Sequence, residues 1–163
     1  MKVSDAIADI LRREGVETII GYPVNHILER GAAAGIRPII VRQERTGLHM
    51  ADAMSRVTSG KQMGVFVMQH GPGTENAYGG VAQAYSESVP LLVIPQGYPR
   101  RIAHIDPNFN SSREMRGIAP CVRIARRHVI HLAARPLSAR PGLTFTIVQL
   151  DIGDGDDQVV VFP

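Results

Sequence analysis

The sequence is poor in cysteine and in long apolar runs, and each shortage excludes a class of protein. Its single cysteine, Cys121, cannot form a disulfide within the chain, which fits a reducing compartment. No apolar run approaches the ~20 residues that a membrane-spanning helix needs. The opening residues, MKVSDAIADI, lack the apolar stretch and cleavage site of a signal peptide. We therefore expect a cytoplasmic protein with no membrane partner.

Aromatic residues are also scarce, which argues against a nucleic-acid-binding protein. They make up 5% of the chain, and tryptophan is absent. The net charge is +3, and arginines gather between residues 100 and 140. We interpret this arginine-rich part as a solvated or interface-lining helical face and expect no nucleic-acid partner.

The six histidines do not predict a metal centre. His128 and His131 are three residues apart, but no nearby Cys, Asp or Glu completes a set of ligands. We therefore expect no metal ligands among the residues of this chain.

The chain does contain a regular alternation of helical and strand patterns. Its 163 residues, 44% of them hydrophobic, suit one globular domain. Helices are predicted over residues 4–13, 26–35, 44–58 and 74–88, and strands over residues 16–21, 36–41, 63–69, 90–96 and 143–152. The short, continuous apolar strands, including residues 36–41, are typical of a parallel sheet buried on both faces. This pattern predicts an α/β fold of three layers, with helices on both faces of an open, mostly parallel sheet. The domain should cover residues 1–152, and residues 153–163 should form a C-terminal tail that docks or stays loose.

Four loops with polar residues and glycines should meet at one edge of this sheet. They follow the carboxyl ends of the first four strands, where ligands bind in open α/β sheets. The loops comprise residues 21–25, 43–44, 69–73 and 96–98. This edge is therefore predicted to hold the functional site.

The segment His70-Gly71-Pro72-Gly73 joins a strand to a helix, and two interpretations stay open for it. A dinucleotide-type phosphate loop would need a third glycine where Asn76 stands, so that signal is weak. The alternative is a tight turn in which glycine lets two backbones approach closely. His70 itself could donate a proton or simply bond a backbone carbonyl.

Glu44 stands at the junction of an apolar strand and a helix, in VRQERTGLHMADAMSR. As a carboxylate at a helix N-terminus, it would be stabilised by the helix dipole. Alternatively, it is a partly buried acid that hydrogen-bonds a ligand and exchanges a proton with it. The local pattern does not decide between these two roles.

Several motifs in order resemble the N-terminal pyrimidine-binding domain of thiamine-diphosphate enzymes, in the acetolactate synthase and pyruvate oxidase group. Residues 42–44 match a strand end of the type Arg-His-Glu, and residues 70–76 match Ser-Gly-Pro-Gly-x-x-Asn. Residues 55–60 and 88–90 match the family's Ala-Arg-x-x-Gly and Ser-x-Pro, and VETIIGYP matches its Val-x-x-Val-Phe-Gly-x-Pro-Gly. The resemblance extends over about residues 3–100 and returns in RPGLTFTIVQLDIG.

This resemblance implies a cofactor, a reaction and a set of site residues. In the family, the glutamate that matches Glu44 hydrogen-bonds N1′ of the aminopyrimidine and passes it a proton. That step activates thiamine diphosphate for decarboxylation or carboligation of a 2-oxo acid. The residues that would line the cofactor are Pro23, Glu44, Pro72 and Asn76. Those on the substrate side would be Gln96, His70 and Asn25.

The chain departs from the family on the substrate side and in length. Gln43 replaces the usual histidine, and Val24-Asn25 replace the usual glycines, so the substrate identity stays open. The family holds Mg²⁺ and the diphosphate with a second domain, marked by Gly-Asp-Gly and a later Asn-Asn. Residues 153–155 are Gly-Asp-Gly, but no Asn pair follows them. We therefore expect that domain to be absent here and the chain to be inactive alone, as a truncated domain or one subunit of a two-chain enzyme.

The expected partners follow from the same resemblance. Family sites are built between chains, so we expect a homodimer that contacts through the helix after Glu44 and the GPGTEN region, where Gly79-Gly80 and Ala82 permit close packing. A diphosphate-binding domain or subunit and a small 2-oxo acid are also expected. Two alternatives stay open: the alpha subunit of a two-chain 2-oxo acid decarboxylase, and a catalytically silent flavodoxin-like module for binding or dimerisation.

Overall fold

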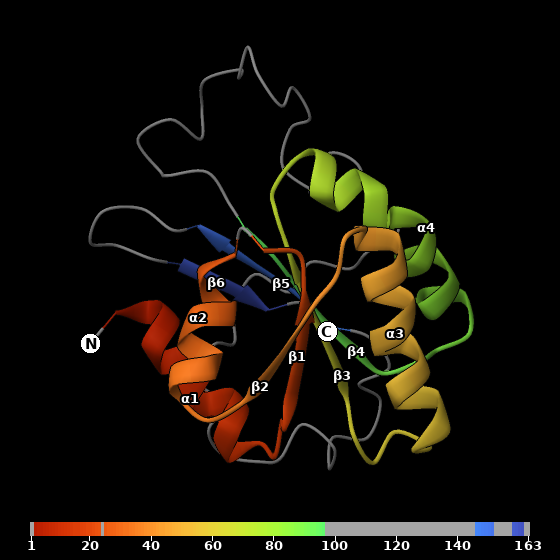
Figure 1. Cartoon of the computed structure of the whole chain (residues 1–163). Helices are drawn as coiled ribbons and strands as arrows, with labels where there is room; N and C mark the ends of the chain where they lie inside the picture. Colours follow the sequence, from red (N-terminus) through yellow and green to blue (C-terminus); the bar gives the residue numbers. More distant parts are fainter. Residues whose placement is uncertain (1, 24, 97–145, 152–157, 162–163) are drawn as a thin grey trace.

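The computed structural model describes residues 2–23, 25–96, 146–151 and 158–161, and it shows a sheet between two helical layers (Figure 1). The helices are α1 (Val3–Arg13), α2 (His26–Ala33), α3 (Glu44–Val57) and α4 (Pro72–Ser86). The strands are β1 (Thr18–Gly21), β2 (Arg37–Ile40), β3 (Gly64–Met68), β4 (Leu91–Pro95), β5 (Thr146–Asp151) and β6 (Gln158–Val161). The predicted α/β class is confirmed. None of the helices in these described ranges combines the length and apolar character needed to cross a membrane.

The described strands form one sheet in the order β2-β1-β3-β4-β5-β6. The pairs from β2 to β5 are all parallel, and β6 runs antiparallel to β5. In the centre, Ile20 of β1 pairs with Ile39 of β2 on one side and with Phe66 of β3 on the other. The strand order reverses between β1 and β3, so the loops after these two strands flank the switch point where open α/β sheets bind ligands.

Each central strand divides its side chains between two cores, because successive residues point to opposite faces. In β3, Phe66 and Met68 pack with residues of α3 and α4, whereas Val65 and Val67 pack with residues of α1 and α2. Every residue of β3 is buried. Burial on both faces explains the continuous apolar runs by which the sequence marks these strands.

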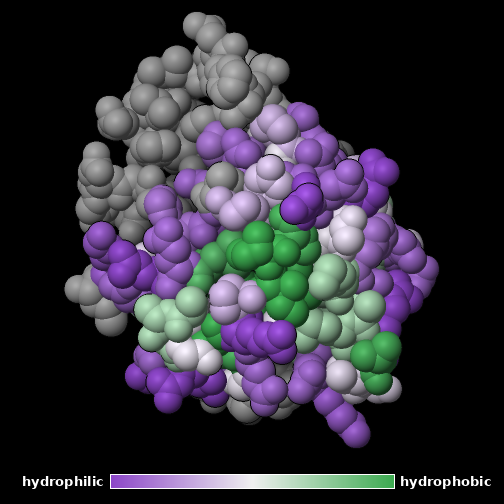
Figure 2. All heavy atoms as spheres, viewed as in Figure 1, coloured by the Kyte–Doolittle hydropathy of each residue, from purple (hydrophilic) through white to green (hydrophobic). Residues whose placement is uncertain are grey.

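The strand β2 lies at the edge of the sheet, and the prediction that it is buried was wrong. Arg37, Pro38 and Ile40 are exposed, and Ile40 keeps 54% of its surface accessible. The N–H groups of Arg37 and Val41 donate to Glu17 and Gly21, so the missing N–H of Pro38 falls on the outer side. A proline there is typical of an edge strand. Figure 2 shows apolar surface over this strand, between the two helical layers.

Beyond residue 96 the structure describes two strands. β5 lies within the predicted last strand and pairs with β4. Residues 158–161, which the sequence placed in a tail, form β6 on β5, so this part of the tail docks on the sheet. The run of three valines suits a strand because β-branched residues favour extended backbone. The arginine-rich part, Cys121 and residues 153–155 lie outside the described residues.

Candidate functional site

Glu44 is the first residue of α3 and lies at the carboxyl edge of the sheet, as predicted. It follows β2 and Val41, and it is the sole acidic residue in the first turn of the helix. Only 7% of its surface is accessible. The side chain of the preceding residue, Gln43, makes no capping hydrogen bond. The carboxylate therefore lies buried at the positive end of a helix, where the helix dipole favours its charge.

The first turns of α4 hold the Glu44 carboxylate. The side-chain amide of Asn76 donates a hydrogen bond to Glu44 Oε2 at 3.1 Å. The other oxygen, Oε1, lies against Gly73, where an added Cβ would stand 3.3 Å from it and 3.0 Å from Cβ of Gln69. Glycine at position 73 thus lets the backbone of α4 approach Oε1 closely. Among the described residues, no hydrogen bond reaches that oxygen.

The loop before α4 is a tight strand-to-helix turn. Gly71 caps α4 with φ 58° and ψ −116°, a backbone conformation that side-chain-bearing residues rarely adopt. Pro72 then begins the helix, where its missing N–H costs nothing. Of the two interpretations of Gly-Pro-Gly, the structure supports the turn, and this turn carries Gly73 and Asn76 to Glu44.

His70 lies in this loop, half-buried, next to the turn. Burial lowers the pKa of its imidazole below the ordinary value, because a low-polarity environment disfavours the charged form. The side chain is therefore neutral at neutral pH. Its assignment to the substrate side stays a prediction.

Asn25 has a structural task that the sequence did not reveal. It is 3% exposed, and its Nδ2 donates to the carbonyl oxygens of Met68 (3.0 Å) and Ile94 (3.1 Å). Its Oδ1 accepts a hydrogen bond from Ile27 N–H at 3.0 Å, which caps α2. One side chain thus ties the loop after β1 to the ends of β3 and β4.

The other predicted residues lie at the same edge. Gln96 follows β4, is half-buried, and donates its backbone N–H to the Met68 carbonyl at 2.9 Å. Pro23 is exposed in the loop after β1. The structure therefore joins Asn25 and Gln96 through Met68, and it joins Asn76 directly to Glu44. The predicted substrate-side roles of Asn25 and Gln96 are not tested by these contacts.

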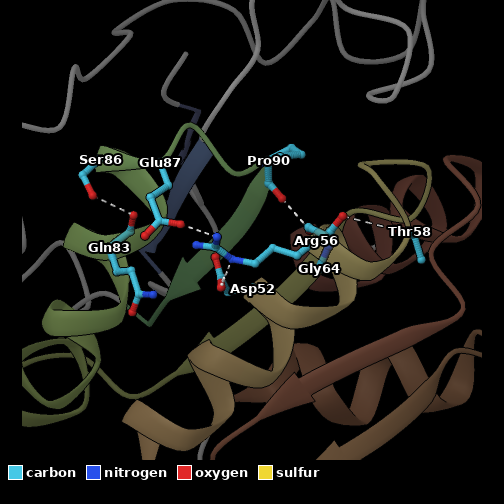
Figure 3. A network of polar contacts seen from close by, with 9 residues as sticks. Asp52, Arg56, Thr58, Gly64, Gln83, Ser86, Glu87 and Pro90 are labelled. Atoms are coloured by element: carbon cyan, nitrogen blue, oxygen red, sulfur yellow. Dashed lines mark hydrogen bonds and ion pairs between the residues drawn. The ribbon is translucent and has the colours of Figure 1, made fainter.

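A second polar cluster lies at the opposite ends of α3 and α4 (Figure 3). Arg56 donates from Nε to Asp52 Oδ2 at 2.6 Å and from a terminal nitrogen to Glu87, which follows α4. The hydrogen bonds with Asp52 and then Glu87 raise the pKa of Arg56 above its already high ordinary value, so this side chain stays charged. The spacing of Asp52 and Arg56, four residues apart on a helix, was the signal in the sequence.

Ser55 strengthens this second cluster from inside the protein. It is 1% exposed, donates to the Pro90 carbonyl at 2.5 Å, and accepts a hydrogen bond from Gly64 N–H at 2.8 Å. Ser55 therefore ties α3 to the starts of β3 and β4. Within the described part of the chain, no group of three or more His, Cys, Asp or Glu residues could hold a metal ion.

Comparisons with known proteins connect this chain to a family of cofactor-dependent enzymes. A family model described as "Thiamine pyrophosphate enzyme, N-terminal TPP binding domain" matches residues 1–119. An acetolactate synthase of Arthrospira platensis is 32% identical over an alignment 178 positions long, which covers 97% of this chain and 30% of the relative. The acetolactate synthase large subunit of Parasynechococcus marenigrum is 40% identical over 102 residues, 58% of this chain and 16% of the relative.

A further relative carries a different activity in its name. The probable 2-ketoarginine decarboxylase of Pseudomonas aeruginosa is 42% identical over 97 residues, 58% of this chain and 17% of the relative. The chain thus spans less than a third of the length of each of these three relatives.

Proposed function

Because the chain belongs to the thiamine pyrophosphate enzymes, as an N-terminal TPP-binding domain, we propose that Glu44 is the carboxylate that activates this cofactor. Thiamine pyrophosphate and thiamine diphosphate are the same compound, so the family match confirms the resemblance seen in the sequence. The proposed whole enzyme is acetolactate-synthase-like and acts on a small 2-oxo acid.

The observation that carries the proposal is the state of the Glu44 carboxylate. It is 7% exposed, one oxygen is held by Asn76, and the other faces a position without a side chain at Gly73. A buried carboxylate needs hydrogen-bond donors for its oxygens. A ring nitrogen that carries a proton would provide such a donor at Oε1, so the residues present fit an aminopyrimidine.

The roles of this chain's residues follow from that fit. Glu44 would hold and release a proton at the ring nitrogen, and its surroundings would exclude water from that exchange. Pro23 and Pro72 would limit the space around the ring, and Gln96 and His70 would face the substrate. When bound, the cofactor supplies the electron sink that decarboxylation of a 2-oxo acid requires. Mg²⁺ and the diphosphate would be held by a second domain or subunit.

We also propose that the partner contacts the exposed side of α3 and α4. Gly79 and Ala82 are exposed on α4, and no atom comes within 4 Å of a Cβ added at Gly79. Gly80 instead faces inward, where an added Cβ would stand 2.6 Å from Leu48 Cδ2. Gly80 thus allows α4 to approach α3, whereas Gly79 and Ala82 leave room for a second chain in a homodimer.

Titration of thiamine diphosphate with Mg²⁺ tests this function. The chain would be examined alone and mixed with a diphosphate-binding domain, with calorimetry for binding and 2-oxo acid consumption for turnover. We expect binding and turnover in the mixture, and loss of turnover with E44Q, which keeps the size of the side chain but cannot carry the proton. Full turnover with E44Q would refute the role of Glu44.

The reaction has a second candidate, because one relative is named as a probable 2-ketoarginine decarboxylase. A simple decarboxylase would release CO₂ and an aldehyde, whereas a carboligase would join two substrate molecules. Product analysis of the same assay mixtures separates the two reactions. An absence of both products with bound cofactor would leave a silent binding module.

A further inference from the structure

Asn76 reaches Glu44 from a distant part of the chain and from the solvent side. The two residues are 32 positions apart, and the hydrogen bond between them is 3.1 Å long. Asn76 itself is exposed, whereas Glu44 is 7% exposed. The amide therefore covers one oxygen of a buried carboxylate without being part of the core.

The two oxygens of Glu44 have different surroundings as a result. Oε2 accepts the Asn76 amide, and Oε1 lies beside Gly73 in the first turn of the same helix. A charge-assisted hydrogen bond from an amide is stronger than a neutral one, and it fixes the torsion that rotates the carboxylate. A carboxylate fixed at one oxygen presents the other in a single direction.

We propose that Asn76 is a positioning residue that holds Glu44 and directs Oε1 toward the ligand. This inference rests on the proposed function, and it gives Asn76 a different task from the cofactor contact that the sequence suggested. The helix α4 supplies both parts of the arrangement, because Gly73 allows its backbone to approach Oε1 and Asn76 holds Oε2. Catalytic geometry of this kind depends on side chains whose own conformations are locked by a second layer of contacts.

The chemistry of the amide explains why asparagine suits this place. Its NH₂ group donates to a carboxylate and cannot itself lose or gain a proton at neutral pH. An aspartate at position 76 would have nearly the same shape but would set a second negative charge against Glu44. N76D therefore removes the donor while it preserves the volume, and N76A removes both.

The test combines the single variants N76A and N76D with E44Q in a double-mutant cycle. It uses the complete enzyme assembled from the full chain and its diphosphate-binding domain, and it measures turnover together with the dissociation constant of thiamine diphosphate. E29A is the control, since Glu29 is an exposed residue of α2, outside the proposed partner contact of α3 and α4, and has no hydrogen bond with Glu44 among the described residues.

We expect N76A and N76D to lower kcat on the order of 10–100-fold, the usual cost of a misplaced catalytic group. The same change should have no further effect in the E44Q background, on cofactor affinity or on residual turnover, because Asn76 acts through Glu44. E29A should match the wild type. In the full chain without cofactor, the Asn76 side-chain amide resonances should move when Glu44 becomes glutamine.

Two outcomes would overturn the inference about Asn76 and leave the proposed function of Glu44 intact. One is unchanged turnover in N76A while E44Q is inactive, and the other is an equal loss of cofactor affinity from N76A in both backgrounds. The second result would mean that Asn76 contacts the cofactor or supports the fold independently of Glu44. Full turnover in E44Q would instead overturn the proposed function, so the two failures are distinguishable.

Discussion

Helices α3 and α4 run side by side, and their two ends are held together in different ways. Where both helices begin, one hydrogen bond links Asn76 to Glu44, and Oε1 lies against Gly73. Where both end, Arg56 bridges Asp52 and Glu87, and Ser55 uses its hydroxyl both to donate and to accept. At the first end, Oε1 accepts no hydrogen bond among the described residues and lies at the edge of the sheet. At the second, Arg56 and Ser55 bond other protein groups, and Asp52 Oδ1 is a buried oxygen that has no partner among the described residues.

This difference separates two tasks within one pair of helices. In our proposal, the far end fixes how α3 and α4 lie on the sheet, and the near end offers its polar groups to another molecule. Changes at the far end should therefore lower stability and leave the cofactor chemistry of the folded enzyme intact. Changes at Glu44 and Asn76 should do the reverse. The predictions below test this division.

The largest effect is expected at Gly64, at the far end. An added Cβ would stand 1.9 Å from the carbonyl oxygen of Ala51, an overlap with helix backbone that no side-chain movement relieves. G64A should lower the free energy of unfolding by more than about 3 kcal/mol, the upper part of the range for overpacking. Urea denaturation of the full chain, followed by circular dichroism, measures this loss.

The matched control for G64A is G79A in the exposed middle of α4, measured at a chain concentration at which no dimer forms. No atom lies within 4 Å of a Cβ added there. Alanine should stabilise the helix by about 0.5–1 kcal/mol relative to glycine. If G64A proved as stable as G79A, the close contact between β3 and α3 could not be what fixes the far end.

A replacement of Asn25 tests the proposed division between a stabilising end and a ligand-binding end. Asn25 lies at the functional edge, yet among the described residues its side chain hydrogen-bonds protein groups. N25D keeps an acceptor for Ile27 N–H but turns the second oxygen toward the carbonyls of Met68 and Ile94. We expect a loss of about 2–4 kcal/mol from the unsatisfied carbonyls and their repulsion. Thermal unfolding of the full chain is the measurement.

N25A provides the comparison for N25D. Aspartate is normally a far better N-cap than alanine. If the side chain served only as a cap, N25D would be the more stable of the two and close to the wild type. An N25D chain that is no more stable than N25A would establish the clamp on β3 and β4 as its main task.

Ser55 should show a smaller effect of the same kind at the far end. S55A leaves a buried N–H of Gly64 and the carbonyl of Pro90 without this partner. The expected loss of unfolding free energy is about 1–3 kcal/mol. S86A, at an exposed serine that bonds only the nearby Gln83 carbonyl, is the control and should change stability by less than about 0.5 kcal/mol. A lowered kcat in correctly folded S55A enzyme would contradict the proposed division.

The sequence predicted the parts of the fold that local patterns encode. Alternating helices and apolar strands, the carboxyl edge and the position of Glu44 at the start of α3 all follow from runs of neighbouring residues. The family resemblance implied that Asn76 and Glu44 both line one cofactor site, but it predicted no contact between the two. The structure shows that the two residues meet.

The parts that escaped prediction depend on strand order and on contacts between distant residues. The run before Glu44 contains Arg37 and Pro38 beside its apolar residues, and its exposure follows from the place of β2 at the edge. Asn25 binds carbonyls 43 and 69 residues away, and Ser55 binds one 35 residues away. Polar residues of this type occur in many loops and helices, so nothing in their local sequence marks such partners.

The smallest expected effect is the pH dependence that His70 adds at the functional edge. Burial lowers the pKa of His70 in the folded chain, whereas in the unfolded chain it should be about 6.5. Between these two values the unfolded chain binds more protons, so stability falls as the pH drops below about 6.5.

H70N removes this contribution, and the variant should lose less stability than the wild type between about pH 7.5 and about pH 5.5. Urea midpoints of both proteins at the two pH values give the difference, in which the titration of the carboxylates cancels. An identical loss in both proteins would mean that His70 is not buried as a neutral group, and that the loop before α4 is more open to water than the contacts around Gly71 and Gly73 indicate.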